Sequence, residues 1–270
     1  MCFIRNQVHT WCSHFILGFT MERNYYRPRY LNCNLMPTPL IPNCPPGLEY
    51  LTQIDQLLIQ QKVELLEAFI GFETKNKYHI KNSMGQKIFN AIEGNMLISA
   101  CCGPVRPFNM KITDSEEQEV LNIYRLLKCQ GCCFPCCLQS MQVTASGVIC
   151  GHIEQTWSLF EPKFKVCDSS GETVLRIEGP FCTFSFCGDV VFKVLSRDGD
   201  TQIGCITKQW SGLAREVFTD ADHFGISFPM DLDVNIKAVL LGACFLIVSI
   251  FFPIQYYFKK KIYFLYAFFS

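Results

Sequence analysis

The sequence predicts an all-β fold with one helix, in which the strands form a barrel or a sandwich. Three observations predict it. Stretches that alternate apolar and polar residues recur roughly every 8 to 12 residues; a pair of strands with its turn occurs twice; and one long apolar run lies near the carboxyl terminus. A duplicated set of strands would close a barrel of about a dozen strands, and closure would leave no free sheet edge.

The first 46 residues are expected to be an irregular segment that precedes the barrel domain. They show no apolar period, and the five prolines between Asn32 and Pro46 are typical of an extended linker. Arg5 is the single arginine or lysine in the first 19 residues, and the apolar stretch there is interrupted, so no signal peptide is expected. The 17 cysteines are therefore expected to face the reducing cytosol.

The barrel domain is expected over residues 47–252, and residues 253–270 form a tail of atypical hydrophobic and basic composition. The first element of the domain is predicted to be a short helix, because Leu51, Ile54 and Leu58 lie at helical spacing. A strand is predicted to follow it, before Gly71.

An internal repeat predicts the paired strands. Lys77-Tyr78, Ile80, Asn82-Ser83, Gly85 and Ile88-Phe89 match Lys163-Phe164, Val166, Asp168-Ser169, Gly171 and Val174-Leu175 at one constant offset. In each copy a stretch of alternating apolar and polar residues is followed by an Asn/Asp-Ser-x-Gly turn and by a second such stretch. This pattern is typical of a β-hairpin. Further hairpins are predicted around Asp114-Ser115 and around Arg197-Asp198-Gly199.

The apolar run near the carboxyl terminus holds no charge from Ala238 to Phe258 and is bounded by Lys237 and Lys259. It is long enough to cross the hydrocarbon core of a bilayer. Pro253 limits the apolar core to fifteen residues, a length that is closer to a buried helix. Two interpretations therefore stay open: a membrane-spanning helix, and a helix that fills a wide barrel.

Four thiols are crowded into Cys132, Cys133, Cys136 and Cys137. Together with Cys129 they repeat a C-x2-C spacing that suits zinc, but adjacent cysteines point apart and no second such pair follows. S-acylation is favoured, because two or more acyl chains make membrane anchoring stable; zinc at this cluster stays open as an alternative. Cysteines outside the cluster are expected to be small buried hydrophobes: Cys150, Cys167, Cys182 and Cys205.

Charge and residue pattern argue against two classes of function. Lysine plus arginine and aspartate plus glutamate both number 24, and no basic stripe occurs, so a nucleic-acid partner is not expected. The five histidines are scattered, and no nucleophile has a base at a recognisable spacing, so an enzyme is not expected.

From Asn43 to Phe252 the chain resembles the phospholipid scramblase family. The motifs that carry the resemblance are Cys44 to Leu51, Gly71 to Thr74, Tyr78 to Gly85, Cys101 to Pro104, Arg106 to Phe108, Cys132 to Gln139, Gln155 to Trp157, Pro162 to Phe164, Cys187 to Val190, and Asp220 to Ile247. The resemblance implies a tubby-like closed antiparallel barrel of about twelve strands around a hydrophobic C-terminal helix from about Lys237. It also implies calcium-responsive, ATP-independent, bidirectional movement of phospholipids between membrane leaflets.

The resemblance assigns three sets of residues. The palmitoylated thiols would be Cys132, Cys133, Cys136 and Cys137; the calcium segment would be Asp220, Asp222, Phe224, Ile226, Phe228 and Asp231; the membrane helix would carry Ala238, Leu240, Leu241, Phe245, Leu246 and Ile247. An EF-hand-like loop takes oxygen ligands, which Phe224 and Phe228 do not supply from their side chains. Their alternation with Ile226 also predicts a strand with acidic ends, and this alternative stays open.

The family's nuclear-import stretch falls on residues 204–216, where Lys208 and Arg215 are the basic residues, and a solvated strand and turn is expected instead. In the tail, Lys259, Lys260 and Lys261 favour the cytosolic side, which argues against a single span with the tail outside. The resemblance implies a plasma-membrane location with most of the chain in the cytosol, and the nucleus without acylation. The alternative function is a palmitoylated, membrane-tethered lipid-binding, interaction and signalling protein without transport; no oligomeric state follows.

Overall fold

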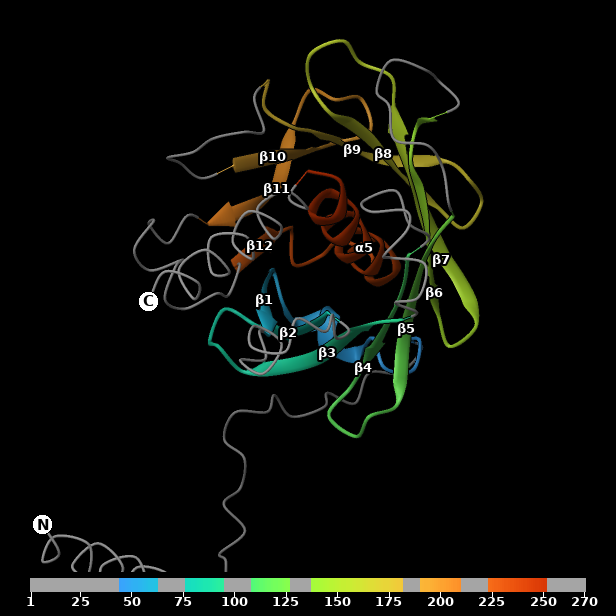
Figure 1. The fold of residues 1–270 in the computed structure, drawn as a ribbon, viewed down its shortest axis with the longest axis vertical. Coiled ribbons are helices and arrows are strands. Elements are labelled where there is room, and N and C mark those ends of the chain that lie inside the picture. Colours follow the sequence, from blue (N-terminus) through green and yellow to red (C-terminus); the bar gives the residue numbers. More distant parts are fainter. Residues whose placement is uncertain are drawn as a thin grey trace, which may run out of the picture. The chain divides into compact units, whose positions relative to one another are not determined.

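The computed structural model describes residues 44–62, 76–94, 108–126, 137–181, 190–209 and 223–251, all of which lie in one compact unit. Twelve antiparallel strands form a closed barrel in which each strand pairs with its sequence neighbours and β1 pairs with β12 (Figure 1). The strands are β1 (Gln56–Lys62), β2 (Lys77–Lys81), β3 (Lys87–Glu93), β4 (Phe108–Thr113), β5 (Glu119–Arg125), β6 (Ser140–Ala145), β7 (Val148–Thr156), β8 (Lys163–Asp168), β9 (Thr173–Glu178), β10 (Val190–Leu195), β11 (Gln202–Gln209) and β12 (His223–Ser227). The predicted all-β closed barrel is confirmed.

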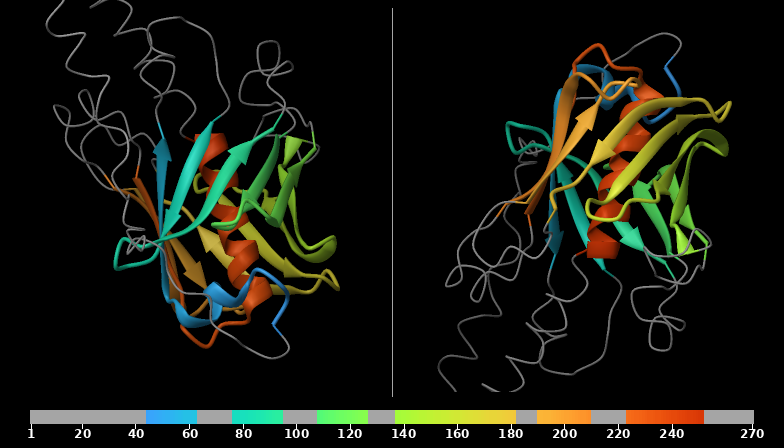
Figure 2. Two further views of the ribbon diagram at one scale, coloured as in Figure 1. Left: turned by 90° about the horizontal axis from the view of Figure 1, so that it is seen from below. Right: turned by 90° about the horizontal axis from the view of Figure 1, so that it is seen from above.

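The α-helix of the described residues, α5 (Val234–Phe251), runs through the interior of this barrel (Figure 2). The strands alternate between residues that face the helix and residues that face outward; in β6, for example, Met141, Val143 and Ala145 are buried. The inward residues and the helix form one hydrophobic core. The predicted C-terminal helix is confirmed, and its surroundings are the barrel wall.

Before the barrel, the chain forms the 3-10 helix η1 (Glu49–Gln53), and β1 follows it after Ile54. The predicted order of a short helix and then a strand is confirmed. The linker predicted before residue 44 and the tail predicted after Phe251 lie outside the described residues.

The two copies of the repeat form equivalent hairpins, β2–β3 and β8–β9. In each turn the first side chain accepts two backbone hydrogen bonds: Asn82 Oδ1 from Met84 and Gln86, and Asp168 Oδ1 from Ser170 and Glu172. Such Asx turns and a glycine with positive φ explain why Asn/Asp-Ser-x-Gly marks this turn.

A third turn, between β4 and β5, has the same hydrogen bonds without the glycine. Asp114 Oδ1 accepts from the amides of Glu116 and Gln118 at 2.8 and 3.0 Å, and Glu117 adopts a φ of +64°. The hairpin predicted at Asp114 is confirmed. This turn keeps the spacing of the other two, but its fourth residue, which takes the left-handed conformation, is a glutamate in place of glycine.

Gly242 lets α5 approach the wall closely. A methyl group at this position would lie 2.6 Å from Cγ2 of Val143 and 3.3 Å from Cδ1 of Ile153. A glycine in a helix interior is unfavourable by about 1 kcal/mol relative to alanine, so its presence here reflects packing against β6 and β7.

The barrel has two different ends. At the turn end, short turns join the strands, such as Ser146-Gly147 between β6 and β7, and α5 begins there. At the loop end, β5, β7 and β9 finish, β6, β8 and β10 begin, and α5 ends. Because the strands alternate in direction, every connection that follows an odd-numbered strand leaves from the loop end.

Candidate functional site

The six residues predicted for a membrane helix all lie inside the barrel. Ala238, Leu240, Leu241, Phe245, Leu246 and Ile247 are each exposed by 1% or less. By length and composition alone, Val234–Phe251 could cross a membrane. In the structure its side chains contact the barrel wall, so the interpretation of a helix that fills a wide barrel describes the observed arrangement.

Lys237 fastens the start of α5 at the turn end. Its ammonium is fully buried and donates hydrogen bonds to the carbonyl oxygens of Leu51, Ile54 and Met230 at 2.9, 3.1 and 2.6 Å. It also lies 5.2 Å from the centre of the Phe228 ring. Burial lowers the pKa of Lys237, and the carboxylates of Asp231 and Asp55 oppose that shift.

The sequence marked Lys237 only as the boundary of an apolar run, and two of its three carbonyl partners, Leu51 and Ile54, come from a segment far away along the chain. Asp233 completes this end of the helix, because its Oδ1 accepts hydrogen bonds from the amides of Asn235 and Ile236. An aspartate that accepts from the first free amides is a typical N-cap.

A second buried cation fastens the end of α5 at the loop end. Arg125, at the end of β5, is 1% exposed and donates a 2.9 Å hydrogen bond from Nη1 to Oγ of Ser249. Phe251, the last residue of α5, packs against the wall at this end, with its ring centre 6.3 Å from that of Phe164 and 5.8 Å from that of Phe192. Sequence reasoning missed Arg125, since nothing local distinguishes it from an exposed strand arginine.

The predicted calcium segment is divided by β12. Asp220 and Asp222 lie outside the described residues, while Phe224, Ile226 and Phe228 are buried core residues. β12 pairs with β1 and β11, so its main-chain groups serve the sheet. Asp231 is exposed beyond the strand, at the turn end. The strand of the alternative prediction is therefore observed, whereas the acidic residues that precede it lie outside the described residues.

The described part of the segment therefore presents one carboxylate, that of Asp231, and no cage of oxygen ligands. Calcium takes six to eight oxygens, and a fully extended strand of five residues is about 16 Å long. Calcium binding stays a prediction that depends on Asp220, Asp222 and Asp231.

Most of the cysteine cluster lies outside the described residues: Cys129, Cys132, Cys133 and Cys136. Cys137 is half-buried, and its carbonyl accepts a 3.0 Å hydrogen bond from the side-chain amide of Gln139. Gln139 also exchanges hydrogen bonds with Gln155. These contacts place the carboxyl end of the cluster against β7 at the loop end. Palmitoylation and zinc binding at the cluster both stay predictions.

Of the other cysteines, Cys150 and Cys167 are buried, as expected, and Cys205 is half-buried. Cys182 lies outside the described residues. Burial raises the pKa of Cys150 to about 11, so the thiol is protonated and unreactive at neutral pH.

The expectation of a solvated strand at residues 204–216 is half right. Residues up to Gln209 form β11, but Lys208 is 6% exposed, with its ammonium 5.8 Å from the centre of the Phe224 ring. The aliphatic part of the Lys208 side chain packs inward, because this position of β11 faces the core. Arg215 lies outside the described residues.

Sequence reasoning also missed three side chains on β7 and β8 that lie close enough together to hold a metal ion. His152, Glu154 and Cys167 bring their ligand atoms within 4.8 Å of one another, and Nε2 of His152 lies 3.6 Å from Oε1 of Glu154. Burial raises the pKa of the Cys167 thiol, so a metal would have to displace its proton. Strand pairing of His152 with Cys167 is enough to explain the grouping.

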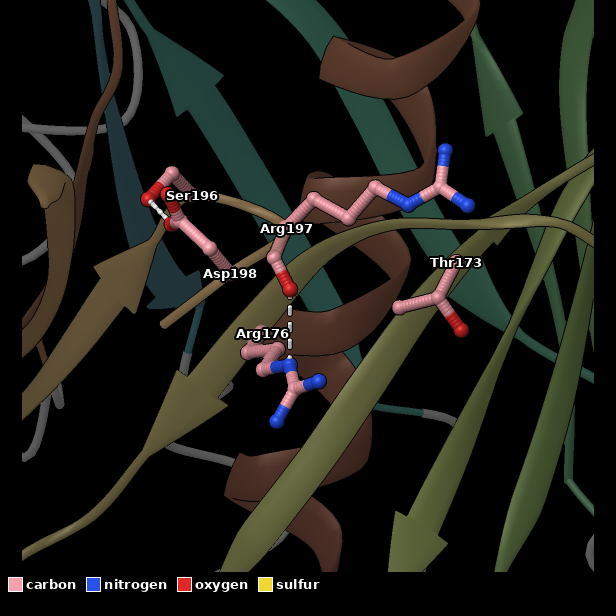
Figure 3. Close-up of a pocket in the computed structure, with 5 residues that line it drawn as sticks. All are labelled: Thr173, Arg176, Ser196, Arg197 and Asp198. Carbon is pink, nitrogen blue, oxygen red and sulfur yellow. Dashed lines mark hydrogen bonds between the residues drawn. The ribbon is translucent and has the colours of Figure 1, made fainter. Parts of the chain in front are cut away.

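A depression of about 600 Å³ at the turn end is lined by Thr173, Arg176, Ser196, Arg197 and Asp198 (Figure 3). Nε of Arg176 donates a 2.9 Å hydrogen bond to the carbonyl oxygen of Arg197, and the Ser196 hydroxyl bonds to Asp198. Arg197 pairs with Glu172. These contacts hold the β10–β11 turn against β9 and leave no catalytic arrangement among the lining residues.

Comparison with known proteins assigns a family. Residues 34–253 match the family model described as Scramblase. The chain is 56% identical to phospholipid scramblase 2 of Bos taurus over 80% of this chain and 75% of that protein. It is 53% identical to phospholipid scramblase 1 of Homo sapiens over 80% of this chain and 69% of that protein. It is 44% identical to human phospholipid scramblase family member 5 over 80% of this chain and 82% of that protein. No solved structure matches the chain.

Proposed function

This chain belongs to the scramblase family, and we propose that it moves phospholipids between the two leaflets of a membrane, in both directions, without ATP and in response to calcium. The observation that carries the proposal is the family match over residues 34–253, which includes every described strand and α5. The relatives are named phospholipid scramblases. Phospholipid is then the transported molecule, and no covalent bond is made or broken.

The filled barrel limits where lipid headgroups can pass. Apart from Lys237, which lies at the turn end, the side chains of α5 from Ile236 to Ile247 are apolar or small and are buried against the wall, so the described residues form no polar path along the helix. A zwitterionic or charged headgroup crossing a dry, close-packed core would lose its hydration. We therefore place the route outside the barrel, where the protein disturbs the bilayer that it contacts.

Acyl chains on Cys132, Cys133, Cys136 and Cys137 would hold the protein at the membrane. The connection that carries them joins β5 to β6 and so leaves from the loop end. Each buried methylene adds about 0.8 kcal/mol of membrane affinity, and two or more chains give stable anchoring. This supports a location at the cytosolic face of the plasma membrane, with release to other compartments, including the nucleus, when the thiols are free.

Calcium would act through the carboxylates of Asp220, Asp222 and Asp231. Asp231 is exposed at the turn end and attracts the buried Lys237 ammonium. A cation on Asp231 would weaken that attraction. Calcium could in this way change how tightly Lys237 holds the start of α5.

The second candidate function is a palmitoylated, membrane-tethered protein that binds lipids or partner proteins and takes part in signalling without transporting lipid. One observation favours it: α5 is sealed inside the barrel and fastened at both ends, by Lys237 and by Arg125. Such a helix is interior packing, and the outer wall would then serve as a binding surface.

Reconstitution separates the two candidates. The purified full chain is placed in vesicles with a fluorescent phospholipid, and an impermeant reductant is added from outside, with and without calcium and without ATP. Transport predicts bleaching beyond the outer-leaflet half, faster with calcium and slower in Asp231→Asn. Bleaching that stops at the outer leaflet in every condition would refute transport and support the tethered binding protein.

A further inference from the structure

Exposed apolar side chains gather on two connections at the loop end. Trp157, Leu159 and Phe160 lie between β7 and β8 and are exposed by 52%, 71% and 67%, and Phe181 follows β9 and is 70% exposed. The ring centres of Phe160 and Phe181 are 5.7 Å apart. Single exposed apolar residues are ordinary, but a cluster on two adjoining connections marks an interaction surface. We call these four residues the aromatic patch.

The aromatic patch stands on a fixed base. The Gly179 amide donates a 2.8 Å hydrogen bond to the Pro162 carbonyl oxygen, and Lys163 Nζ lies 2.7 Å from Oε1 of Glu178. Gly179 permits this approach, because a methyl group there would lie 2.5 Å from Cγ of Pro162 and would also clash with the ring of Phe192. The two connections are therefore hydrogen-bonded to each other where they leave the strands, and the exposed rings need no rearrangement to form one surface.

The chain shows which partner suits this surface. The cysteine-rich connection after Arg125 and the tail after Phe251 both leave the barrel at the same end as the aromatic patch. The tail sequence combines many aromatic residues with Lys259, Lys260 and Lys261. Tryptophan and other aromatic side chains concentrate at membrane interfaces, and lysines attract anionic lipid headgroups. A phospholipid bilayer is the one partner that suits the aromatic patch and the composition of both segments that leave the barrel beside it.

We propose that the aromatic patch inserts into the boundary between headgroups and acyl chains of a phospholipid bilayer. The barrel would then be oriented with its loop end facing the membrane. The inference rests on the proposed membrane function and adds which folded side chains contact lipid. The anchors hold the chain near the bilayer, and the patch determines its orientation.

Tryptophan quenching tests the insertion directly. The full chain has three tryptophans, so Trp11→Phe together with Trp210→Phe leaves Trp157 as the single reporter and keeps the patch intact. Mixed with vesicles of phosphatidylcholine and phosphatidylserine that carry bromine on the acyl chains, this protein should show a blue-shifted emission and strong quenching. A protein that does not bind, or that binds without quenching of Trp157, would overturn the proposal.

A matched pair of variants tests the contribution to binding. Trp157→Ser with Phe160→Ser and Phe181→Ser should weaken co-flotation of unacylated protein with these vesicles by about tenfold or more. The control, Val148→Ser with Ile149→Ser, removes exposed apolar residues from the turn end and should bind like the unaltered chain. Equal loss in both variants would overturn the proposal.

Two further results are decisive. If the patch variant alone lost a dimer that the unaltered chain forms without lipid, the patch would be a contact between copies and the proposal would be wrong. In vesicles with the unaltered chain, the reductant could bleach inner-leaflet lipid while Trp157 of the single-tryptophan protein stayed unquenched. Lipid transport would then stand, and insertion of the aromatic patch would be refuted. If the patch variant failed to fold, the quenching result would still decide, because that protein keeps the patch.

Discussion

Arg125 donates a 2.9 Å hydrogen bond to the hydroxyl of Ser249, and that hydroxyl donates in turn to the carbonyl oxygen of Leu246. The last turn of α5 is thus connected to the end of β5, as Lys237 connects the first turn to η1 and to the turn before the helix. A helix fastened at both ends behaves as part of the barrel.

Ser249→Ala should lower the free energy of unfolding by about 2 kcal/mol, because a hydrogen bond to a buried charged group is lost. Amide exchange in the last turn of α5 should accelerate more than exchange in its first turn. The rate of lipid movement in vesicles should stay the same, since α5 remains inside. A large rise in calcium-independent transport would contradict this, because it would mean that release of the helix end opens the lipid path.

Lys237→Met should destabilise the protein by about 3 kcal/mol, because the carbonyl oxygens of Leu51, Ile54 and Met230 lose a shared donor. Urea denaturation monitored by circular dichroism measures the change. The control is Lys193→Met on the outer face of β10, which should change stability by less than about 0.5 kcal/mol. Equal effects of the two substitutions would show that the buried ammonium is not a fastening point.

Gly242→Ala should destabilise the protein although alanine is the better helix former, because the added methyl group would meet Val143. Val143→Ala alone should also destabilise, by about 2 kcal/mol, through a cavity. The double variant should be more stable than the sum of the two losses implies, since the smaller wall residue admits the methyl group. Additive losses in urea denaturation would count against close packing at this point.

Asp168→Asn should make stability less sensitive to acid. Hydrogen bonds from Ser170 and from the Glu172 amide lower the pKa of the Asp168 carboxyl below its ordinary 3.8. A lowered carboxyl pKa stabilises the fold above pH 3.8, and this contribution is lost as the pH falls through the lower folded value. Asparagine keeps the acceptor, as Asn82 does in the equivalent turn, and does not titrate. Urea midpoints measured between pH 7 and pH 2.5 should therefore fall less steeply in the variant, and parallel curves would contradict the prediction.

Replacement of Cys132, Cys133, Cys136 and Cys137 by serine should abolish labelling by an alkynyl palmitate and move the chain from the membrane fraction to the soluble fraction. Cys44→Ser is the control, since Cys44 is half-buried beside η1 and outside the cluster. Labelling of the fourfold variant at the unaltered level would exclude these thiols as the acylation sites. Zinc bound in proportion to these cysteines would support the metal alternative instead.

The fold could be predicted well from sequence because its signals are local. Alternation, the Asn/Asp-Ser-x-Gly turns and the repeat predicted the hairpins, and the described residues form a barrel of twelve strands around the α-helix α5. The Asp114 turn shows where a local rule is incomplete, because Glu117 adopts the left-handed conformation that glycine takes in the other turns.

The position of α5 could not be settled from sequence, because an apolar helix in a barrel and one in a bilayer have the same composition. The contacts of Lys237 and Arg125 are equally hidden, since their partners lie far away in the chain. The aromatic patch was missed for a similar reason: Phe160 and Phe181 belong to different connections that only the barrel brings together. Sites that depend on folding, as these do, need the structure.

The central claim is that the barrel works at the membrane with α5 still packed inside it. Vesicles in which the full chain is active can be prepared with a phospholipid that carries a photoreactive group midway along its acyl chain, and the adducts can be mapped by mass spectrometry. We expect adducts around Trp157, Phe160 and Phe181 and none between Ile236 and Ile247. Adducts along α5 would contradict it and would show that the helix leaves the barrel and enters the bilayer.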